Sequence, residues 1–315
     1  MARSPLFVRK QPGGSYHVDN TALTVGNIWY VDGNASGKGT SSAYGYSPDA
    51  PFSTVAAALD SGNLAAGDIL FVASGHTETL SAAAGWDVDT EGVQIIGLGV
   101  GSKKPTITLG TATTTDIDID ADNVLIRNFR FVGNIDDLAT FIDCNSNYFT
   151  IEDCEFVTSS TKEALCFIDM ATTKDYLTVR RCRFEQPTDP GGSDGGAGTG
   201  GIYLVDSEYI HVQDCMFVGN FETAAIHNKT TACKYLVVER CYVYSALSGS
   251  EPLQLVAGAI GCAKECFFHT PAEAATTEAT LYGTLGDGFF IAQSTSAGND
   301  GAAGGQGGIA PTAAS

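Results

Sequence analysis

VRRCRF at residues 179–184 is one of six segments in this chain that share one pattern. Each segment has an aliphatic residue, two variable residues, an apolar residue that is usually cysteine, a variable residue and a bulky apolar residue. The other five are IRNFRF (126–131), IEDCEF (151–156), VQDCMF (212–217), VERCYV (238–243) and AKECFF (263–268). Their fourth positions lie 25, 28, 33, 26 and 25 residues apart. Such a period is typical of a stacked repeat, in which each unit buries its apolar face against its neighbours.

A second apolar segment precedes the pattern in most of the repeats. These segments are residues 117–119, 141–143, 167–169, 202–205, 225–227 and 253–256. Two or three short strands within 25–33 residues leave too little room for a crossover helix. The sequence therefore predicts an all-β fold, a parallel β-helix (a solenoid). Two earlier coils, around Ile69 and around Ile95, bring the total to about eight.

The two ends of the chain depart from the repeat. Residues 1–27 form an extended N-terminal arm without clear periodicity, and the β-helix is predicted over 28–270. Ser53 or Thr54 can cap a short helix near 53–61, which would cover the open apolar end of the first coil. Residues 271–315 form a C-terminal extension that ends in a Gly/Ala-rich tail. Such a tail buries too little to fold alone, so both termini are expected to be extended.

The nine cysteines all fall within the repeat region. Five of them occupy the same position in successive coils: Cys154, Cys182, Cys215, Cys241 and Cys266. Free cysteine behaves as a small, readily buried apolar residue. The odd total and the expected reducing compartment argue against a disulfide framework. The sequence therefore predicts an interior row of free thiols.

Charge and hydropathy exclude two classes of partner. The chain has 36 acidic and 17 basic residues, a net charge of −19, and such a body repels a phosphate backbone, so no nucleic acid is expected. No apolar run approaches the roughly 18 residues that a membrane span needs, so no membrane is expected. Residues 1–14 lack the apolar segment of a signal peptide. We therefore expect the chain to be made and folded in a cytoplasm.

Four stretches resemble the opening of the pectate-lyase-like right-handed β-helix superfamily: YVD (30–32) with GYSPDAPF (45–52), then GDILFV (67–72), then IIGLG (95–99). The run at 113–137 resembles phage and prophage β-helix proteins. The resemblance covers about residues 28–270. It implies that the solenoid is right-handed, and that the chain is a virion protein of a tailed bacteriophage.

Three aspartates are candidates for chemistry. Asp118, Asp143 and Asp169 lie near the ends of equivalent strands and are expected to stack along one face. Stacked acids can bind calcium or shift one another's pKa, as an enzyme would need, and Arg180 and Arg181 are close in sequence. The alternative is that these aspartates end strands because their side chains bond to the turn backbone.

Nothing else in the sequence indicates a catalytic or metal-binding set. His17, His76, His211, His227 and His269 are scattered, with no serine or cysteine partner that suggests a triad. No basic motif of a lyase and no distinct carboxylate pair stands out from the acidic background. The sequence therefore predicts no catalytic residue, no metal site, no cofactor and no enzymatic activity.

The leading prediction for function is a capsid decoration (cement) protein, assembled in the host bacterial cytoplasm and located on the capsid surface of the virion. It would be a homotrimer that contacts the major capsid protein and neighbouring copies. Arg3, Arg9 and Lys10 would form the docking arm, because residues 1–10 contain no acid in an otherwise acidic chain. The alternative is a tailspike or tail fibre that binds or depolymerises host polysaccharide. A secreted polysaccharide lyase is disfavoured by the missing signal peptide.

Overall fold

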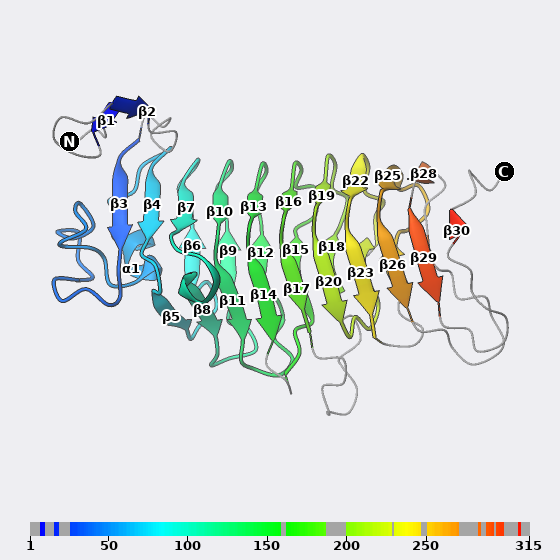
Figure 1. Cartoon of the computed structure of the whole chain (residues 1–315), viewed down its shortest axis with the longest axis horizontal. Coiled ribbons are helices and arrows are strands. Elements are labelled where there is room, and N and C mark those ends of the chain that lie inside the picture. Colours follow the sequence, from blue (N-terminus) through cyan, green and yellow to red (C-terminus); the bar gives the residue numbers. More distant parts are fainter. Residues whose placement is uncertain are drawn as a thin grey trace.

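The computed structural model describes residues 7–9, 16–18, 26–158, 162–186, 200–228, 230–246, 251–270, 283–284, 288–292, 294–298 and 308–309. Apart from residues 7–9 and 16–18, they form the predicted parallel β-helix, and it is right-handed, as the family resemblance implies (Figure 1). Three long sheets run along it, named sheet 1, sheet 2 and sheet 3, and from β4 to β29 the chain passes through sheets 2, 3 and 1 in that order.

Sheet 1 has eight strands: β6 (Trp86–Val88), β9 (Ile117–Ile119), β12 (Ile142–Cys144), β15 (Cys166–Met170), β18 (Gly200–Leu204), β21 (Ala224–Asn228), β24 (Glu251–Gln254) and β27 (Gly283–Thr284). Sheet 2 has ten: β3 (Ile28–Val31), β4 (Ile69–Val72), β7 (Gln94–Gly97), β10 (Leu125–Arg127), β13 (Thr150–Glu152), β16 (Thr178–Arg180), β19 (His211–Gln213), β22 (Leu236–Glu239), β25 (Ile260–Lys264) and β28 (Gly288–Ala292).

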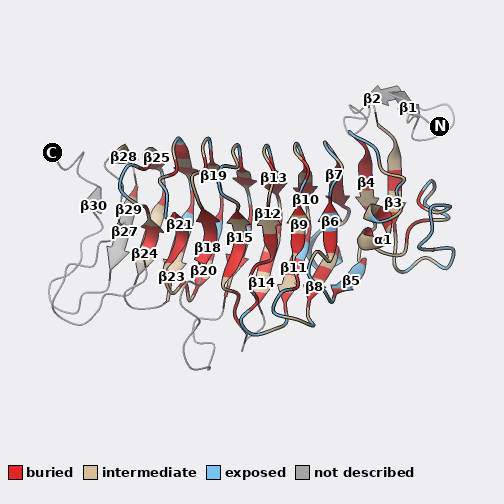
Figure 2. Cartoon of the chain, turned by 180° about the vertical axis from the view of Figure 1, so that it is seen from behind, coloured by how far each residue is buried: buried red, intermediate tan, exposed pale blue. Residues whose placement is uncertain are grey.

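Sheet 3 also has ten strands: β5 (Thr77–Leu80), β8 (Thr106–Leu109), β11 (Arg130–Gly133), β14 (Glu155–Thr158), β17 (Arg183–Glu185), β20 (Met216–Gly219), β23 (Tyr242–Ser245), β26 (Phe267–Thr270), β29 (Thr295–Gly298) and β30 (Gly308–Ile309). Pairing is parallel along the three sheets except between β29 and β30. In many strands buried residues alternate with more exposed ones (Figure 2), as in β9, β11 and β14, whereas β18 is buried throughout. In β10, for example, Ile126 is buried between Leu125 and Arg127.

Single residues in the left-handed region make the corner between sheet 2 and sheet 3. They stack in successive coils as Asn128, Asp153, Arg181, Asp214, Arg240 and Glu265, with φ between 50° and 65°. Their charges alternate along most of the row, which we name the charge ladder. Arg181 donates to both carboxylate oxygens of Asp153, at 2.7 and 2.9 Å. Arg240 does the same to Asp214, at 2.7 and 3.1 Å.

A second left-handed row makes the corner between sheet 1 and sheet 2. After Asn123 it consists of Tyr148, Tyr176, Tyr209 and Tyr235, all exposed. Their rings stack with centroids 4.4, 4.7 and 4.7 Å apart and interplanar angles of 16° or less. We name this row the tyrosine ladder. A bulky residue in this backbone region is strained, and the stacking offsets part of that strain.

The interior consists of stacked rows of like residues. Phe131, Phe156, Phe184 and Phe217 stack on the inner side of sheet 3 with centroids 4.6–5.0 Å apart. The predicted cysteine row is confirmed, because Cys154, Cys182, Cys215, Cys241 and Cys266 are free and buried. Each thiol donates to a backbone carbonyl, as Cys154 does to Glu152 at 3.2 Å. These rows make one continuous core along the solenoid.

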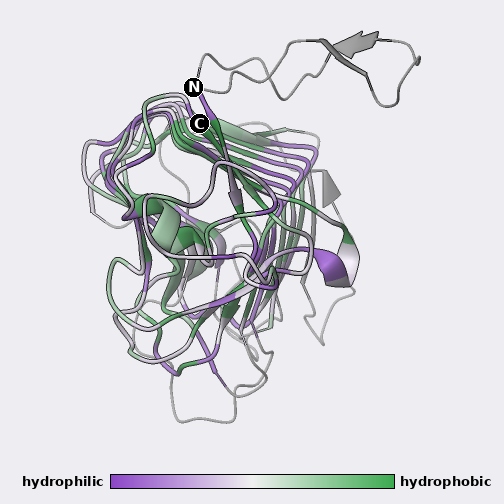
Figure 3. Cartoon of the chain, turned by 90° about the vertical axis from the view of Figure 1, so that its left-hand side faces the viewer, coloured by the Kyte–Doolittle hydropathy of each residue, from purple (hydrophilic) through white to green (hydrophobic). Residues whose placement is uncertain are grey.

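The helix that the sequence places near 53–61 is observed as α1 (Val55–Leu59), across one end of the solenoid (Figure 3). Thr54 caps it by accepting from the backbone N–H of Ala57 at 3.1 Å. Buried Glu78 adds a second cap, because its two oxygens accept from the N–H groups of Val55 and Ala56. The helix buries Val55 and Ala58 and so covers the first coil.

The N-terminal arm contains a feature that the sequence did not predict. Strands β1 (Phe7–Arg9) and β2 (Tyr16–Val18) pair antiparallel. Of the predicted docking arm, only Arg9 belongs to a strand, and Arg3 and Lys10 lie outside the described residues. Most of 271–315, including the Gly/Ala-rich tail, also lies outside them. Within the described part of the chain, no helix is long and apolar enough to cross a membrane.

Candidate active site

Four aspartates form one row on the outer face of sheet 1. The strand register pairs Asp87 with Asp118, Asp118 with Asp143, and Asp143 with Asp169. Buried residues flank each of them on its strand, so the carboxylates face outward. Neighbouring strands are about 4.8 Å apart, and the acids repeat at about that spacing. The predicted stacking of Asp118, Asp143 and Asp169 is therefore observed, and Asp87 extends it.

The row continues with residues of other types. In the same register, Asp169 pairs with Tyr203, Tyr203 with His227, and His227 with Gln254. The rings of Tyr203 and His227 meet edge to face with centroids 5.1 Å apart. Sequence reasoning missed all three, although each carries a usable signal. Each follows the buried aliphatic residue of its sheet 1 strand, as Asp143 follows Ile142.

Burial and mutual repulsion raise the pKa of Asp118 and of Asp143. Desolvation, followed by the charges of Asp116 and Asp143, raises the pKa of Asp118 to about 7. One oxygen of Asp118, Oδ1, is buried and has no hydrogen-bond partner among the described residues. Desolvation and then the charge of Asp169 also raise the pKa of Asp143. Asp118 is therefore about half protonated at neutral pH.

Other aspartates perform the structural role that was the alternative for the row. Asp122 accepts from the backbone N–H of Asn147 at 2.8 Å, and Asp175 accepts from that of Glu208 at 2.8 Å. Both lie in the turns between sheet 1 and sheet 2, not in the row. Bonding to the turn backbone thus accounts for these two acids, whereas the row lies on the outer face of sheet 1.

The two arginines considered with the row lie elsewhere. Arg180 is on β16 of sheet 2, where it donates to Glu152 at 3.0 Å, and Arg181 belongs to the charge ladder. The structure therefore does not bring them to the row. Among the residues that the structure describes, no three acidic, histidine or cysteine side chains converge as the ligands of one metal ion. What the row offers is a protonated carboxyl group beside further carboxylates.

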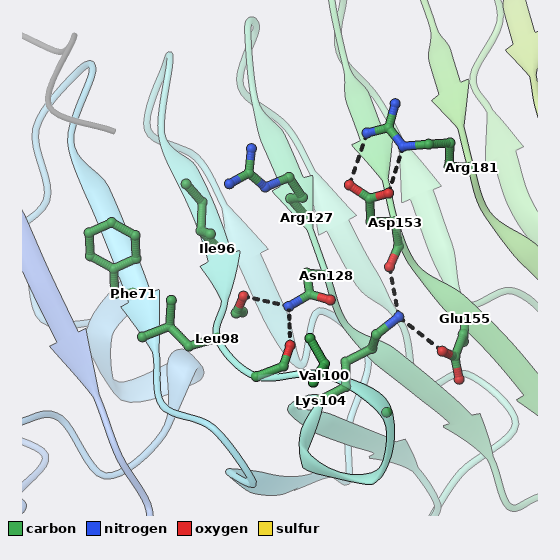
Figure 4. A pocket seen from close by; sticks show the side chains of 13 residues that line it. Phe71, Ile96, Leu98, Val100, Lys104, Arg127, Asn128, Asp153, Glu155 and Arg181 are labelled. Atoms are coloured by element: carbon green, nitrogen blue, oxygen red, sulfur yellow. Dashed lines mark hydrogen bonds and ion pairs between the residues drawn. The ribbon is translucent and has the colours of Figure 1, made fainter. Parts of the chain in front are cut away.

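A hollow lies on a different face, where sheet 2 turns into sheet 3 (Figure 4). Its cavity volume is about 590 Å³. The loop after β7, which contains the short 3₁₀ turn η2 (Gly101–Lys103), forms one side of it. Arg127, Asn128 and Arg181 line the opposite side. The aspartate row is not part of this hollow.

Comparison with known proteins shows the fold alone. No protein family and no curated protein matches the chain. Among solved structures, a rhamnogalacturonan lyase matches with a TM-score of 0.50 and 10% identity over 85% of this chain and 87% of that one. The pectate lyase Pel9A matches with a TM-score of 0.55 and 10% identity over 85% of this chain and 78% of that one.

These matches correct one prediction from the sequence. We expected a chain without enzymatic activity, and that prediction is contradicted by this comparison, since the two solved structures named above are a rhamnogalacturonan lyase and a pectate lyase, both enzymes. The resemblance to the pectate-lyase-like superfamily is confirmed at the level of fold. Neither match is a phage protein. The chemistry of this chain therefore depends on its own side chains, and the aspartate row is the densest group of acids among those described above.

Proposed function

We propose that this chain hydrolyses glycosidic bonds of a neutral polysaccharide at the aspartate row of sheet 1. The observation that carries the proposal is the strand register that stacks Asp87, Asp118, Asp143 and Asp169 on the outer face of sheet 1, where burial and neighbouring charges raise the pKa of Asp118 to about 7. Glycoside hydrolysis needs a protonated carboxyl group at the leaving oxygen and a second carboxylate nearby. Asp118 is the general acid, and the next acids of the row supply the second group.

The spacing of the row distinguishes two versions of this reaction. Asp143 is one strand from Asp118, about 4.8 Å, which is close to the separation at which the second carboxylate attacks the sugar directly. Asp169 is two strands away, about 9.6 Å, which leaves room for an attacking water. The first version retains the anomeric configuration and the second inverts it. The anomeric configuration of the first product therefore shows whether Asp143 or Asp169 is the second carboxylate.

The same row argues for a neutral substrate. A polyuronate would bring its carboxylates against those of Asp87, Asp118, Asp143 and Asp169, and like charges repel. The row contains no lysine or arginine that could neutralise a uronate or serve as the base of an elimination. Hydrolysis of a neutral glycan needs neither group.

The test is cleavage of a panel of neutral polysaccharides by the purified chain, measured as new reducing ends and by mass spectrometry of the products. D118N is expected to lower the rate at least a hundredfold, because the amide cannot protonate the leaving oxygen. The wild-type rate should fall as the pH rises above 7, because the acid must be protonated to act.

The matched control is D49N, because Asp49 is an exposed loop acid outside the row. It should keep the wild-type rate and pH profile. If no neutral glycan is cleaved, or if D118N cleaves as fast as D49N, the proposal is wrong. Products with a new double bond would show elimination in place of hydrolysis.

The virion predictions stay predictions. Capsid decoration, a trimer, contact with the major capsid protein and a location on the capsid surface concern partners that the single chain does not contain. The alternative prediction, a tailspike that depolymerises host polysaccharide, is compatible with both a virion location and the proposed hydrolysis. The position of the protein on purified particles decides between the two: many copies on the head support decoration, and a few copies confined to the tail support the tailspike.

A further inference from the structure

We infer that the hollow beside the loop after β7 is a binding site for a small aliphatic carboxylate. The site is separate from the aspartate row, and the inference does not depend on the proposed hydrolysis. It rests on three observations: the two chemically distinct sides of the hollow, the local surplus of positive charge, and the one arginine there whose donors are largely unused.

One side of the hollow is apolar. Phe71 and Ile96 are neighbours in register on the outer face of sheet 2. Leu98 and Val100 project from the loop beside them and are 43% and 82% exposed (Figure 4). Large exposed apolar side chains that gather at a cavity are a common mark of a ligand site. The cavity volume of about 590 Å³ lies within the usual range for small ligands.

The loop that forms this side is held in place. Asn128 donates through Nδ2 to the carbonyl oxygens of Gly97 and Gly99, at 2.7 and 3.0 Å. Gly99 has φ of 98°, and a Cβ there would lie 2.4 Å from the carbonyl oxygen of Lys103. The loop therefore needs glycine at this position. These contacts hold the backbone that carries Leu98 and Val100, so binding would require little ordering of the loop.

The other side of the hollow is polar, and most of its groups are already paired. Lys104 donates to the carbonyl oxygen of Asp153 and to Glu155, both at 2.9 Å. Arg181 is held by Asp153 and also donates to Glu152 at 2.9 Å. These bonds fix the polar side before any ligand arrives.

Arg127 is the exception. Its one ion pair among the described residues is a long one, 3.7 Å from Nη1 to Oε1 of Glu152. Glu152 is shared with Arg180 and Arg181, so one carboxylate serves three guanidinium groups. Of the charged residues that line the hollow, three are cations, Lys104, Arg127 and Arg181, and two are the carboxylates of Asp153 and Glu155. The hollow thus has a local positive surplus on a chain with a net charge of −19.

The position of Arg127 defines the ligand. It is next to Ile96 and two strands from Phe71 in the same outward row, a span of about 9.6 Å. A carboxylate can take two parallel hydrogen bonds from a guanidinium group. An aliphatic chain attached to that carboxylate would lie along Ile96 and Phe71, beneath Leu98 and Val100. An aliphatic monocarboxylate of about eight carbons matches both sides of the site.

The test is isothermal titration of the full chain with octanoate. Acetate and octanol are the paired probes, since each carries one half of the proposed ligand. We expect octanoate to bind at least tenfold more tightly than either. R127Q should weaken octanoate binding at least tenfold, and V100S should weaken it severalfold without unfolding the chain, because Val100 is mostly exposed.

The control variant is R130Q, because Arg130 is an exposed arginine on sheet 3 that does not line the hollow. R130Q should bind octanoate as the wild type does. The inference is overturned if octanoate does not bind, if octanol binds as tightly as octanoate, or if R127Q binds as tightly as R130Q. Circular dichroism of each variant confirms that a lost affinity is not lost folding.

Discussion

Asp118 shows how a surface row can hold a neutral acid. Its strand buries Ile117 and Ile119 on the other side of the sheet, and its carboxyl group faces outward between like charges. Desolvation and repulsion both penalise the ionised form, so the pKa rises to about 7. The same shift makes folding stability depend on pH.

Replacing Asp118 with asparagine is expected to change that pH dependence. The folded chain keeps a proton between pH 4 and 7 that the unfolded chain has lost, so the stability from this group is full below pH 4 and is lost as the pH rises through 7. D118N should therefore be more stable than wild type at pH 8, by about 1 kcal/mol after allowance for solvent screening. Urea unfolding at pH 4, 6 and 8 measures the effect. Equal stability at every pH would show that the proton is not held.

The thiols give a second prediction at this scale. Cys262 is partly exposed on sheet 2, whereas the other eight cysteines are buried. Burial also raises the pKa of Cys144 and of Cys233 to about 11, which disfavours the reactive thiolate. Iodoacetamide at pH 8 should label Cys262 first, as read by peptide mass spectrometry. In urea all nine should react, and early labelling of Cys182 in the native chain would contradict the buried row.

At the scale of elements, the tyrosine ladder sets backbone strain against ring stacking. Tyr176 has φ of 65° and stacks on Tyr148 and Tyr209. Most residues avoid this backbone region by about 1 kcal/mol or more, whereas glycine enters it freely. Each stacked pair of rings stabilises the fold by about 0.5–1.5 kcal/mol. The two terms are similar in size, so they can be separated by substitution.

Two substitutions of Tyr176 separate the terms. Y176A should lower the free energy of unfolding by about 1–3 kcal/mol, because it removes two stacked contacts and keeps the strain. Y176G loses the same contacts but relieves the strain, so it should be more stable than Y176A by about 1 kcal/mol. Thr178, on the neighbouring strand β16, is the control position. There the alanine variant T178A should be more stable than the glycine variant T178G, because glycine weakens a strand. If the alanine variant is the more stable one at both positions, the backbone at Tyr176 is not strained.

The elements also show what a sequence can predict. Strands such as β13 and β16 follow from the period, since Ile151 and Val179 recur at the same place in each repeat. The hollow does not follow from it. Its loop, at 98–104, interrupts the repeat, and Arg127 reaches it only through the register of β7 with β10. That register depends on how many residues each turn contains, which the pattern does not state.

At the scale of the whole molecule, the solenoid is a one-dimensional stack. Each coil pairs with the coil before it and the coil after it, and the core is a set of rows that cross every coil. The stability of such a chain is a sum of coil terms and nearest-neighbour terms. A defect in the middle should therefore uncouple the two halves.

Phe184 is the place to make that defect. It lies between Phe156 and Phe217 in the stacked row, with centroids 4.9 and 4.6 Å away. F184A should lower the free energy of unfolding by about 3–5 kcal/mol. Hydrogen exchange should then show coils on one side of β17 losing protection before those on the other side. Uniform loss along the chain would show that the stack unfolds as one unit.

The whole molecule likewise shows which part of the candidate site was within reach of the sequence. Asp118, Asp143 and Asp169 could be predicted as a row because the same residue type recurs after the same buried position. Tyr203 and His227 occupy the same position on their strands but are not aspartates. The recurrence of one residue type therefore could not predict them as members of the row. The raised pKa values arise from burial and from neighbours on other coils, and these are properties of the stack.

The charge ladder has a consequence for how this solenoid changes length. Removal of the one coil that contains Arg181 would place Asp153 directly against Asp214, and two like charges would meet at a single corner. Removal of two successive coils would place Asp153 against Arg240, and an ion pair would form again. The alternating charges at this corner therefore favour an even change in the number of coils over an odd one. The chain can be shortened or extended there by pairs of coils without electrostatic penalty, and by a single coil only at a cost.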